Sequence, residues 1–239
     1  RCAIENATSA ASMLLNAGCC MIDVKQSFDT DYWSEKKAKE RGILKEDILK
    51  EWKYKADFAT QKGSAFHAFA ENYLFNKVFP FPEEEMTSVL GSVENMLECR
   101  EALNHIIKLF KKFYEDSFGK LVPVRAELVV GDEELGLCGM VDQLFWNEKS
   151  GMLEIWDWKT NKEIKERNKW QQFKDPISHL DVCELNTYSL QLSTYKYIIE
   201  KNTNLKLGDS YIVWLNEKND NYKVFKCHDF QEEVVNILK

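Results

Sequence analysis

The sequence predicts an α/β fold, in which a helical N-terminal part precedes a mixed β-sheet flanked by helices. Two observations predict it. Apolar residues recur at helical spacing through roughly the first half of the chain, and from Leu121 onward short segments rich in alternating apolar residues are separated by turn residues. A helical segment and further strands follow, so the core has the order α-β-β-β-α-β.

The helices are expected first. Gly42 interrupts a charged run that carries apolar residues at helical spacing, and Pro80 and Pro82 separate the next helix from one that opens with acidic residues at Glu83. The expected helices cover residues 7–16, 33–55 (interrupted at Gly42), 59–76, 83–97 and 103–119.

Near Leu121 the spacing of apolar residues changes from helical to alternating, which marks the start of the predicted sheet. Two short turns separate the first three strands, which predicts an antiparallel meander. A polar loop over 160–183 leads into the next helix. The expected elements are strands at 121–130, 137–146 and 153–159, a helix at 184–201, strands at 211–216 and 222–227, and a closing helix at 230–238.

Composition limits the class of protein. With 239 residues, of which 44% are hydrophobic, the chain can bury a sizeable core. We expect a single domain over 1–239, with a helical part at 1–58 and the core at 59–239. Only 4 Pro and 10 Gly exclude collagen-like and linker-like chains. No stretch approaches the ~18 uncharged apolar residues of a membrane span, so no membrane partner is expected.

Charge and cysteine content narrow the class further. A net charge of −7 argues against a protein that coats nucleic acid by bulk charge, but not against an enzyme with a local acidic site. The 7 cysteines form no C-x-x-C pair, which predicts reduced thiols in an intracellular protein, cytoplasmic if bacterial or phage. The chain begins at Arg1 without a signal-peptide pattern and reads as a fragment.

The most informative residues are Asp142, Asp157 and Lys159. Asp157 and Lys159 are two positions apart on one strand, so they project from the same face, and Asp142 lies on the preceding strand. Two adjacent carboxylates repel each other unless a cation lies between them, and hard oxygen ligands suit Mg²⁺ or Mn²⁺. An Asp-x-Lys pair alone is most often an exposed ion pair. Here Trp156 and Trp158 make the other face apolar, which favours a central strand with a functional polar face.

These residues resemble motifs of the PD-(D/E)xK nuclease superfamily, in particular its RecB-like exonuclease branch. The resemblance runs from about residue 63 to 199 and implies a restriction-endonuclease-like core. The matching pieces, in chain order, are Gly63-x-x-x-His67, Glu127, Gly139-x-Val141-Asp142, Asp157-x-Lys159-Thr160 and Gln191-x-x-x-Tyr195.

The resemblance implies a Mg²⁺- or Mn²⁺-dependent deoxyribonuclease, more an exonuclease than an endonuclease, with DNA as partner and other replication or recombination proteins as candidate partners. Lys159 would be catalytic together with Asp142 and Asp157, and Gln191 and Tyr195 would hold substrate or the lysine. The implied metal ligands are His67, Asp142, Asp157, the Trp158 backbone carbonyl and Glu127.

Each implied role has a structural alternative. His67 could instead pair with Glu71, which lies one helical turn further along. Glu127 could be an exposed strand residue. Tyr195 could belong to the core, because apolar residues flank it at helical spacing.

A basic segment follows the Asp-x-Lys strand. Over residues 162–174 five basic residues oppose two acidic ones, and Trp170 and Phe173 are interleaved with them. This composition suits a lip that contacts phosphates and stacks a base, or equally a solvated loop with two core-seeking aromatics. The candidate substrate-binding residues of this segment are Lys162, Lys165, Arg167 and Trp170.

Two patterns are missing from the sequence. The close-set cysteine group that holds an iron–sulfur cluster in some RecB-like nucleases is absent, so no cluster is expected, and no G-x-x-x-x-G-K-[ST] motif occurs. Two other functions stay open: an RNA endonuclease of the cap-snatching type, and a non-catalytic module that binds nucleic acid or protein.

Overall fold

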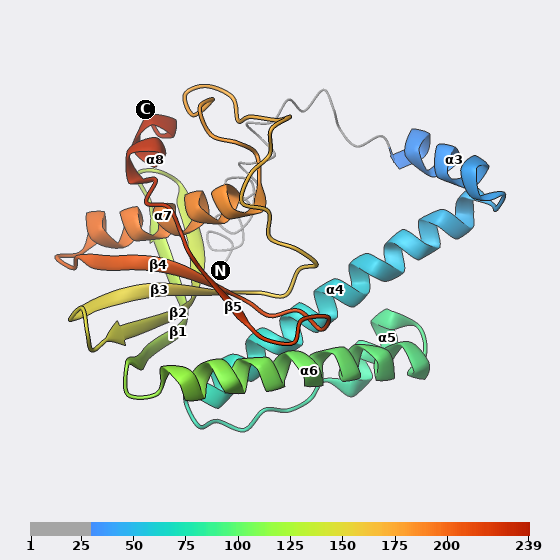
Figure 1. Ribbon diagram of the computed structural model, residues 1–239, viewed down its shortest axis with the longest axis horizontal. Helices are drawn as coiled ribbons and strands as arrows, with labels where there is room; N and C mark the ends of the chain where they lie inside the picture. The colour runs from blue at the N-terminus through green and yellow to red at the C-terminus, as the bar shows by residue number, and fades with distance from the viewer. Residues whose placement is uncertain (1–29) are drawn as a thin grey trace. The chain divides into compact units, whose positions relative to one another are not determined.

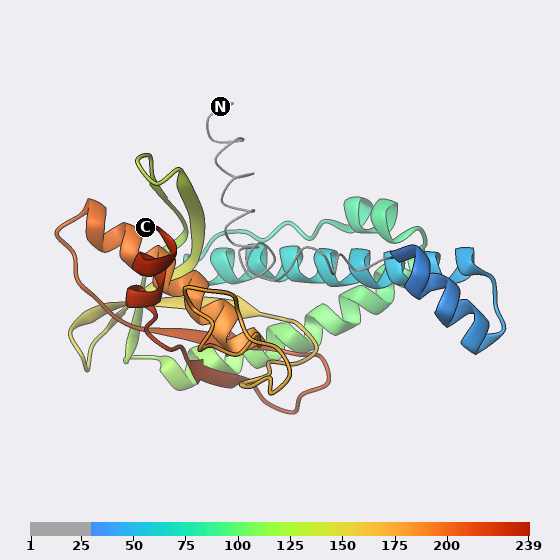
Figure 2. The same ribbon diagram turned by 90° about the horizontal axis from the view of Figure 1, so that it is seen from above.

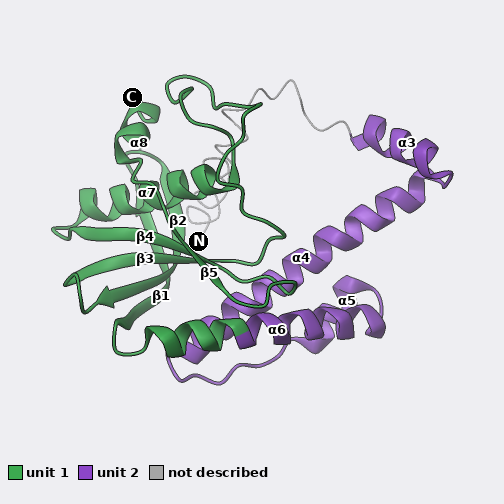
Figure 3. Cartoon of the chain, viewed as in Figure 1, with its two compact units in different colours: residues 1–23, 109–239 green, residues 24–108 purple. Residues whose placement is uncertain are grey.

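The computed structural model describes residues 30–239, so the helix expected at 7–16 lies outside the described residues. Two compact units divide the chain. Leu109–Lys239 belongs to one of them and Val24–Lys108 forms the other, as Figure 3 shows. The first holds the whole sheet and the second is helical, which agrees with the predicted α/β fold with N-terminal helices.

The helical unit begins with α3 (Thr30–Arg41) and α4 (Lys45–Leu74). Gly42 separates them as predicted, and its φ of +66° is the left-handed conformation that ends a helix at low cost in glycine. The break expected between residues 55 and 59 is wrong, because α4 is one helix of 30 residues. Residues 56–58 are compatible with a helix, and buried Ile48, Phe66 and Ala70 continue one apolar stripe along it.

A second boundary also differs from the prediction. The expected helix at 83–97 is in fact divided into α5 (Glu83–Leu90) and the start of α6 (Val93–Ser117). Gly91 ends α5 with φ +80°, and the Ser92 hydroxyl accepts a 3.1 Å hydrogen bond from the Asn95 backbone N–H at the start of α6. α6 then runs unbroken across the gap expected at 98–102.

The sheet has five strands in the order β1-β2-β3-β4-β5 (Figure 1). The first three form the predicted antiparallel meander, β4 runs parallel to β3, and β5 is antiparallel to β4, so the sheet is mixed. β3 is central, as its two tryptophans predict. The strands are β1 (Leu121–Asp132), β2 (Leu137–Asn147), β3 (Met152–Lys159), β4 (Leu207–Trp214) and β5 (Lys223–Lys226).

Helices cover both faces of this sheet. α7 (Glu184–Asn202), with α8 (Gln231–Ile237) against it, covers the face to which Ile155 and Leu192 contribute buried side chains. The last turns of α6 cover the other face, where Phe113 packs against Trp156 and Trp158 with ring centroids 5.5 and 5.7 Å apart. Alternation along β3 therefore gives it one aromatic face and one face directed to α7.

The β1–β2 hairpin bends in its middle. Near its tip the odd-numbered Val141 of β2 packs in the α7-side cluster, whereas further along the even-numbered Leu144 does so. Glu127 lies opposite this change and has φ +47°, a left-handed conformation that is uncommon for a residue other than glycine. The bend carries the hairpin past the other strands and over α7 (Figure 2).

The two edges of the sheet are irregular or short. β1 contains Pro123, and its pairing with β2 shifts register directly after that residue. β5 has only 4 residues, with an exposed lysine at each end, Lys223 and Lys226. Among the helices that the structure describes, none has the length and apolar character needed to cross a bilayer.

Candidate active site

β2 and β3 separate at the acidic positions. Their last registered pair at this end is Gln143 with Trp156, so Asp142 and Asp157 occupy the next positions along the two strands. The Trp158 backbone N–H donates a 2.9 Å hydrogen bond to an Asp142 carboxylate oxygen. The Asp142 carboxylate thus takes the place of a backbone carbonyl as the acceptor. This hydrogen bond holds the carboxylate beside the Asp157-x-Lys159 segment.

Asp157 and Lys159 form a buried ion pair on the α7 face. The Lys159 Nζ lies 2.6 Å from an Asp157 carboxylate oxygen, and the two side chains are 18% and 2% exposed. Burial by itself would lower the pKa of Lys159. The carboxylates of Asp157 and Asp142 outweigh it, so the pKa of Lys159 is raised and its amine is held as an ammonium.

Glu127 joins Asp142 from the neighbouring strand. It lies between the registered pairs Ala126 with Gln143 and Leu128 with Val141, directly across from Asp142. Carboxylate oxygens of Glu127 and Asp142 lie within 4.8 Å of each other, and both residues are half-buried. The left-handed backbone of Glu127 therefore occurs at the point where the hairpin presents two acids together, as strained residues often do at functional sites.

α7 forms the wall facing these residues. The Lys159 Nζ lies 4.6 Å from the centre of the Tyr188 ring, which is a cation–π contact. The Gln191 side-chain amide donates a 3.0 Å hydrogen bond to the Tyr195 hydroxyl, and burial raises the pKa of Tyr195. Tyr195 is only 2% exposed and belongs to the core cluster, as its structural alternative expects, and its role in holding substrate or the lysine stays a prediction.

Sequence reasoning missed Tyr188 as a site residue. Its spacing from Gln191 and Tyr195, three and seven positions, puts all three on one helical face, and this was the available signal.

Gly139 gives Tyr195 the space it occupies. A Cβ built on Gly139 would come within 2.8 Å of the Tyr195 Cζ and would also collide with the ring carbon Cε1. Any other residue at this position would therefore push α7 and β2 apart. The glycine of the Gly139-x-Val141-Asp142 motif thus has a packing function that fixes the distance between the acidic strand and the helical wall.

The basic segment between β3 and α7 is a loop that hydrogen bonds hold in place. Asn168 donates from its side chain to the Val182 carbonyl at 2.8 Å, and the Lys165 backbone N–H donates to Glu184 at the start of α7. The two aromatics separate: Phe173 is 3% exposed and Trp170 is 95% exposed. Lys162, Lys165 and Arg167 are exposed along the same loop.

His67 belongs to the helical unit. It lies half-buried on α4, with its ring edge against Phe66 at a centroid distance of 6.1 Å. Glu71, its alternative partner, forms a 2.7 Å ion pair with Lys77. The role of His67 as a metal ligand remains a prediction from the sequence.

The donor set suits a hard divalent cation. Asp142 and Glu127 offer carboxylate oxygens close together, and the buried Asp157 lies at the same end of the neighbouring strand. Mg²⁺ and Mn²⁺ prefer such oxygen ligands, and a sparse set leaves room for water and for phosphate oxygens. The residues present therefore fit a metal of this type, and none of the three donors is a soft thiolate.

The comparison with protein-family models identifies a family. Residues 44–236 match the sequence model of the PD-(D/E)XK nuclease superfamily. The chain is also similar to the crystal structure of a Eubacterium rectale protein described as a “Putative exonuclease”, with a TM-score of 0.41 and 13% sequence identity, over 76% of this chain and 63% of that chain. The chain thus spans less than two thirds of that protein's length. No curated protein matches.

Proposed function

The chain belongs to the PD-(D/E)XK nuclease superfamily, and on this premise we propose that it is a Mg²⁺- or Mn²⁺-dependent nuclease that hydrolyses DNA phosphodiester bonds. The observation that carries the proposal is the buried Asp157–Lys159 pair beside Asp142, at the point where the two strands separate. Buried charges in a structural role are costly, whereas a site that handles a phosphodiester needs them.

Each residue has a distinct role in this proposal. Asp142 and Asp157 hold the metal together with the Trp158 backbone carbonyl. Glu127 supports it directly or through water, and His67 supplies a nitrogen ligand. A divalent cation bound there lowers the pKa of a water molecule and neutralises charge on the phosphate.

Lys159 acts as an electrostatic group. Its ammonium can orient the attacking water or hold a phosphate oxygen as negative charge develops in the transition state. Tyr188 and Asp157 limit the positions that the ammonium can take, since they contact it at 4.6 Å and 2.6 Å. Gln191 and Tyr195 complete the wall beside the scissile bond, and Gln191 is the half-buried member of that pair and the one able to reach substrate.

The choice of DNA and of exonuclease action rests on the sequence pattern. The Gln191-x-x-x-Tyr195 helix after the Asp-x-Lys strand resembles the RecB-like branch. Lys162, Lys165 and Arg167 would contact phosphates, and Trp170 would stack on a base of the strand that enters or leaves the site.

The test is a cleavage assay on end-labelled DNA and RNA with Mg²⁺, Mn²⁺ or EDTA, together with calorimetric titration of Mn²⁺. We expect metal-dependent cleavage of DNA, release of short products from the ends, and loss of cleavage in Asp157→Asn and Lys159→Ala. Lys218→Ala, which alters an exposed lysine on the loop after β4, is the matched control and should retain activity. Wild-type cleavage in both site variants would refute the proposal, and faster cleavage of RNA would redirect it to the endonuclease alternative.

A further inference from the structure

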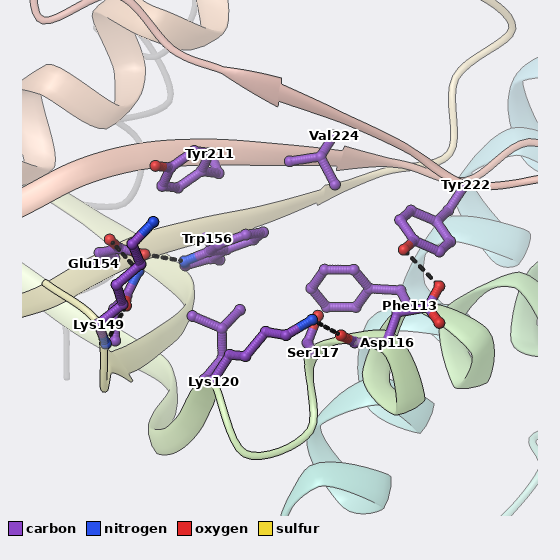
Figure 4. A pocket seen from close by; sticks show the side chains of 12 residues that line it. Phe113, Asp116, Ser117, Lys120, Lys149, Glu154, Trp156, Tyr211, Tyr222 and Val224 are labelled. Carbon is purple, nitrogen blue, oxygen red and sulfur yellow. Dashed lines mark hydrogen bonds between the residues drawn. The ribbon is translucent and has the colours of Figure 1, made fainter.

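A cavity lies on the face of the sheet opposite Lys159. It has a volume of about 320 Å³ and lies between the C-terminal turn of α6 and the sheet, with lining residues from all five strands (Figure 4). Its lining includes Trp156, whose neighbours Asp157 and Lys159 face the other way. This cavity is therefore separate from the candidate active site.

The cavity offers a flat aromatic platform. The rings of Trp156 and Tyr211 stack with centroids 4.5 Å apart and an interplanar angle of 25°. Trp156 is buried behind Tyr211, whereas Tyr211 is half-buried and Val224, 40% exposed, lies along the same opening. A planar ring can stack on such a surface without displacing a side chain.

A carboxylate, that of Glu154, stands beside these rings, and Asn147, Trp156 and Ser150 hydrogen-bond to it. The Asn147 side-chain amide donates to one Glu154 oxygen at 2.8 Å, and the Trp156 indole N–H donates to the other at 3.2 Å (Figure 4). Glu154 is 3% exposed, so its position is set by these bonds. A carboxylate has about four acceptor sites, so it keeps the capacity to accept a further donor.

Two lysines line the cavity, beside the acidic residues Asp116 and Glu154. The Lys120 Nζ donates to the Asp116 carbonyl at 2.7 Å, which holds the ammonium at the end of α6, and Lys149 lies on the β2–β3 turn. Both are exposed at the mouth of the cavity. Lysine ammonium groups in this position suit a phosphate.

We propose that this cavity binds a guanine nucleoside monophosphate, with its base against the Tyr211 ring and its phosphate at Lys120 and Lys149. A carboxylate accepts hydrogen bonds only. Guanine presents two adjacent donors, N1–H and the N2 amino group, whereas adenine and cytosine each place an acceptor next to their amino group and thymine has one donor between two carbonyls. The inference does not depend on the hydrolytic chemistry proposed above.

The experiment is a titration of the full chain in EDTA with dGMP, dAMP, dCMP, dTMP and deoxyguanosine, followed by calorimetry and tryptophan fluorescence. We expect saturable binding of dGMP that is at least about tenfold tighter than that of dAMP or dTMP, because a buried carboxylate facing an acceptor loses a charge-assisted hydrogen bond. Deoxyguanosine should bind more weakly than dGMP.

Variants separate the parts of this cavity. Lys120→Ala combined with Lys149→Ala should weaken dGMP about tenfold and leave deoxyguanosine unchanged, while Lys218→Ala changes neither. Glu154→Gln keeps an acceptor for the Asn147 amide or the Trp156 indole and should abolish the preference for guanine. Thermal unfolding of each variant shows whether it is folded.

Two results would overturn the inference: no saturable binding of dGMP at millimolar concentration, or binding that Glu154→Gln and the lysine variants leave unchanged. Asp157→Asn should bind dGMP like the wild type. A failure here therefore leaves the nuclease proposal standing, and loss of cleavage activity leaves this inference standing.

Discussion

The backbone N–H of Trp158 donates a 2.9 Å hydrogen bond to an Asp142 carboxylate oxygen, which joins β2 to β3 beyond their last registered pair. The same carboxylate is therefore part of the fold and part of the proposed metal site. These two functions can be separated, because an amide oxygen can replace the acceptor but not the charge.

Asp142→Asn should retain the hydrogen bond and unfold at close to the wild-type temperature, yet lose cleavage by more than about 100-fold because a charged ligand is gone. Asp142→Ala should lose both activity and about 1 kcal/mol of unfolding free energy. Thermal unfolding and cleavage rates measure the two effects. Equal stability of the two variants would show that the hydrogen bond contributes nothing.

The Asp157–Lys159 pair should show strong energetic coupling. Lys159→Met removes the ammonium from a buried carboxylate and should cost about 3–5 kcal/mol of unfolding free energy, whereas the double variant with Asp157→Asn should cost much less. Urea denaturation of the wild type, the two single variants and the double variant measures the coupling energy. Additive single effects would contradict a buried pair.

Gly139→Ala should destabilise the protein by about 1–3 kcal/mol, because its new methyl group overlaps the Tyr195 ring. Combining it with Tyr195→Leu should recover part of this loss. Tyr195→Phe should not, since ring carbons as well as the hydroxyl meet the methyl group. Denaturation midpoints of the wild type and these three variants test this, and rescue by phenylalanine would mean that the hydroxyl alone causes the clash.

Trp170→Ala should leave the unfolding temperature unchanged, because the side chain is 95% exposed. The variant should bind single-stranded DNA with a binding free energy weaker by about 1–3 kcal/mol, which is the contribution of one stacked base. Trp170→Phe should retain most of the wild-type affinity. Fluorescence anisotropy with a labelled oligonucleotide measures both. If Trp170→Ala bound DNA as tightly as the wild type, Trp170 would have no part in DNA binding and the loop would be only a solvated connection.

Low pH should weaken the ion pair between Asp132 of the β1–β2 hairpin and Lys201 of α7. A hydrogen bond from Lys201 lowers the pKa of Asp132 from 3.8 to about 2, so the carboxylate stabilises the fold above its ordinary pKa and loses this effect as the pH falls toward 2. Asp132→Asn should therefore be less stable than the wild type at neutral pH, and the difference should shrink between pH 4 and pH 2. Unfolding midpoints across this range test the link; a constant difference would contradict it.

Periodicity predicted most of the elements. The strands starting at Leu121 and Leu137 and the helix starting at Glu184 begin at the expected residues, since each start coincides with a change of hydrophobic period. The helix boundaries near residues 56 and 91 were wrong, because a glycine or a short polar stretch can either continue or end a helix. Gly91 ends one with a left-handed φ, whereas Gly63 lies inside α4.

The site was predictable only in part. The alternation of Asp157 and Lys159 with two tryptophans predicts a polar and an apolar face, and the structure has both. The left-handed backbone of Glu127 could not be foreseen, because it results from the bend of the hairpin and not from local preference. The helical spacing of Tyr188 from Gln191 and Tyr195 could have indicated its face of α7, but its contact with Lys159 depends on how α7 packs on the sheet.

The edges of the sheet have a consequence for the protein in concentrated solution. An open sheet exposes unpaired backbone groups at both outer strands, where another copy could add a strand. Pro123 and the register shift interrupt this template on β1, and the brevity of β5 and its lysines Lys223 and Lys226 interrupt it on the other side. The fold thereby opposes the addition of a strand from another copy at either edge of the sheet.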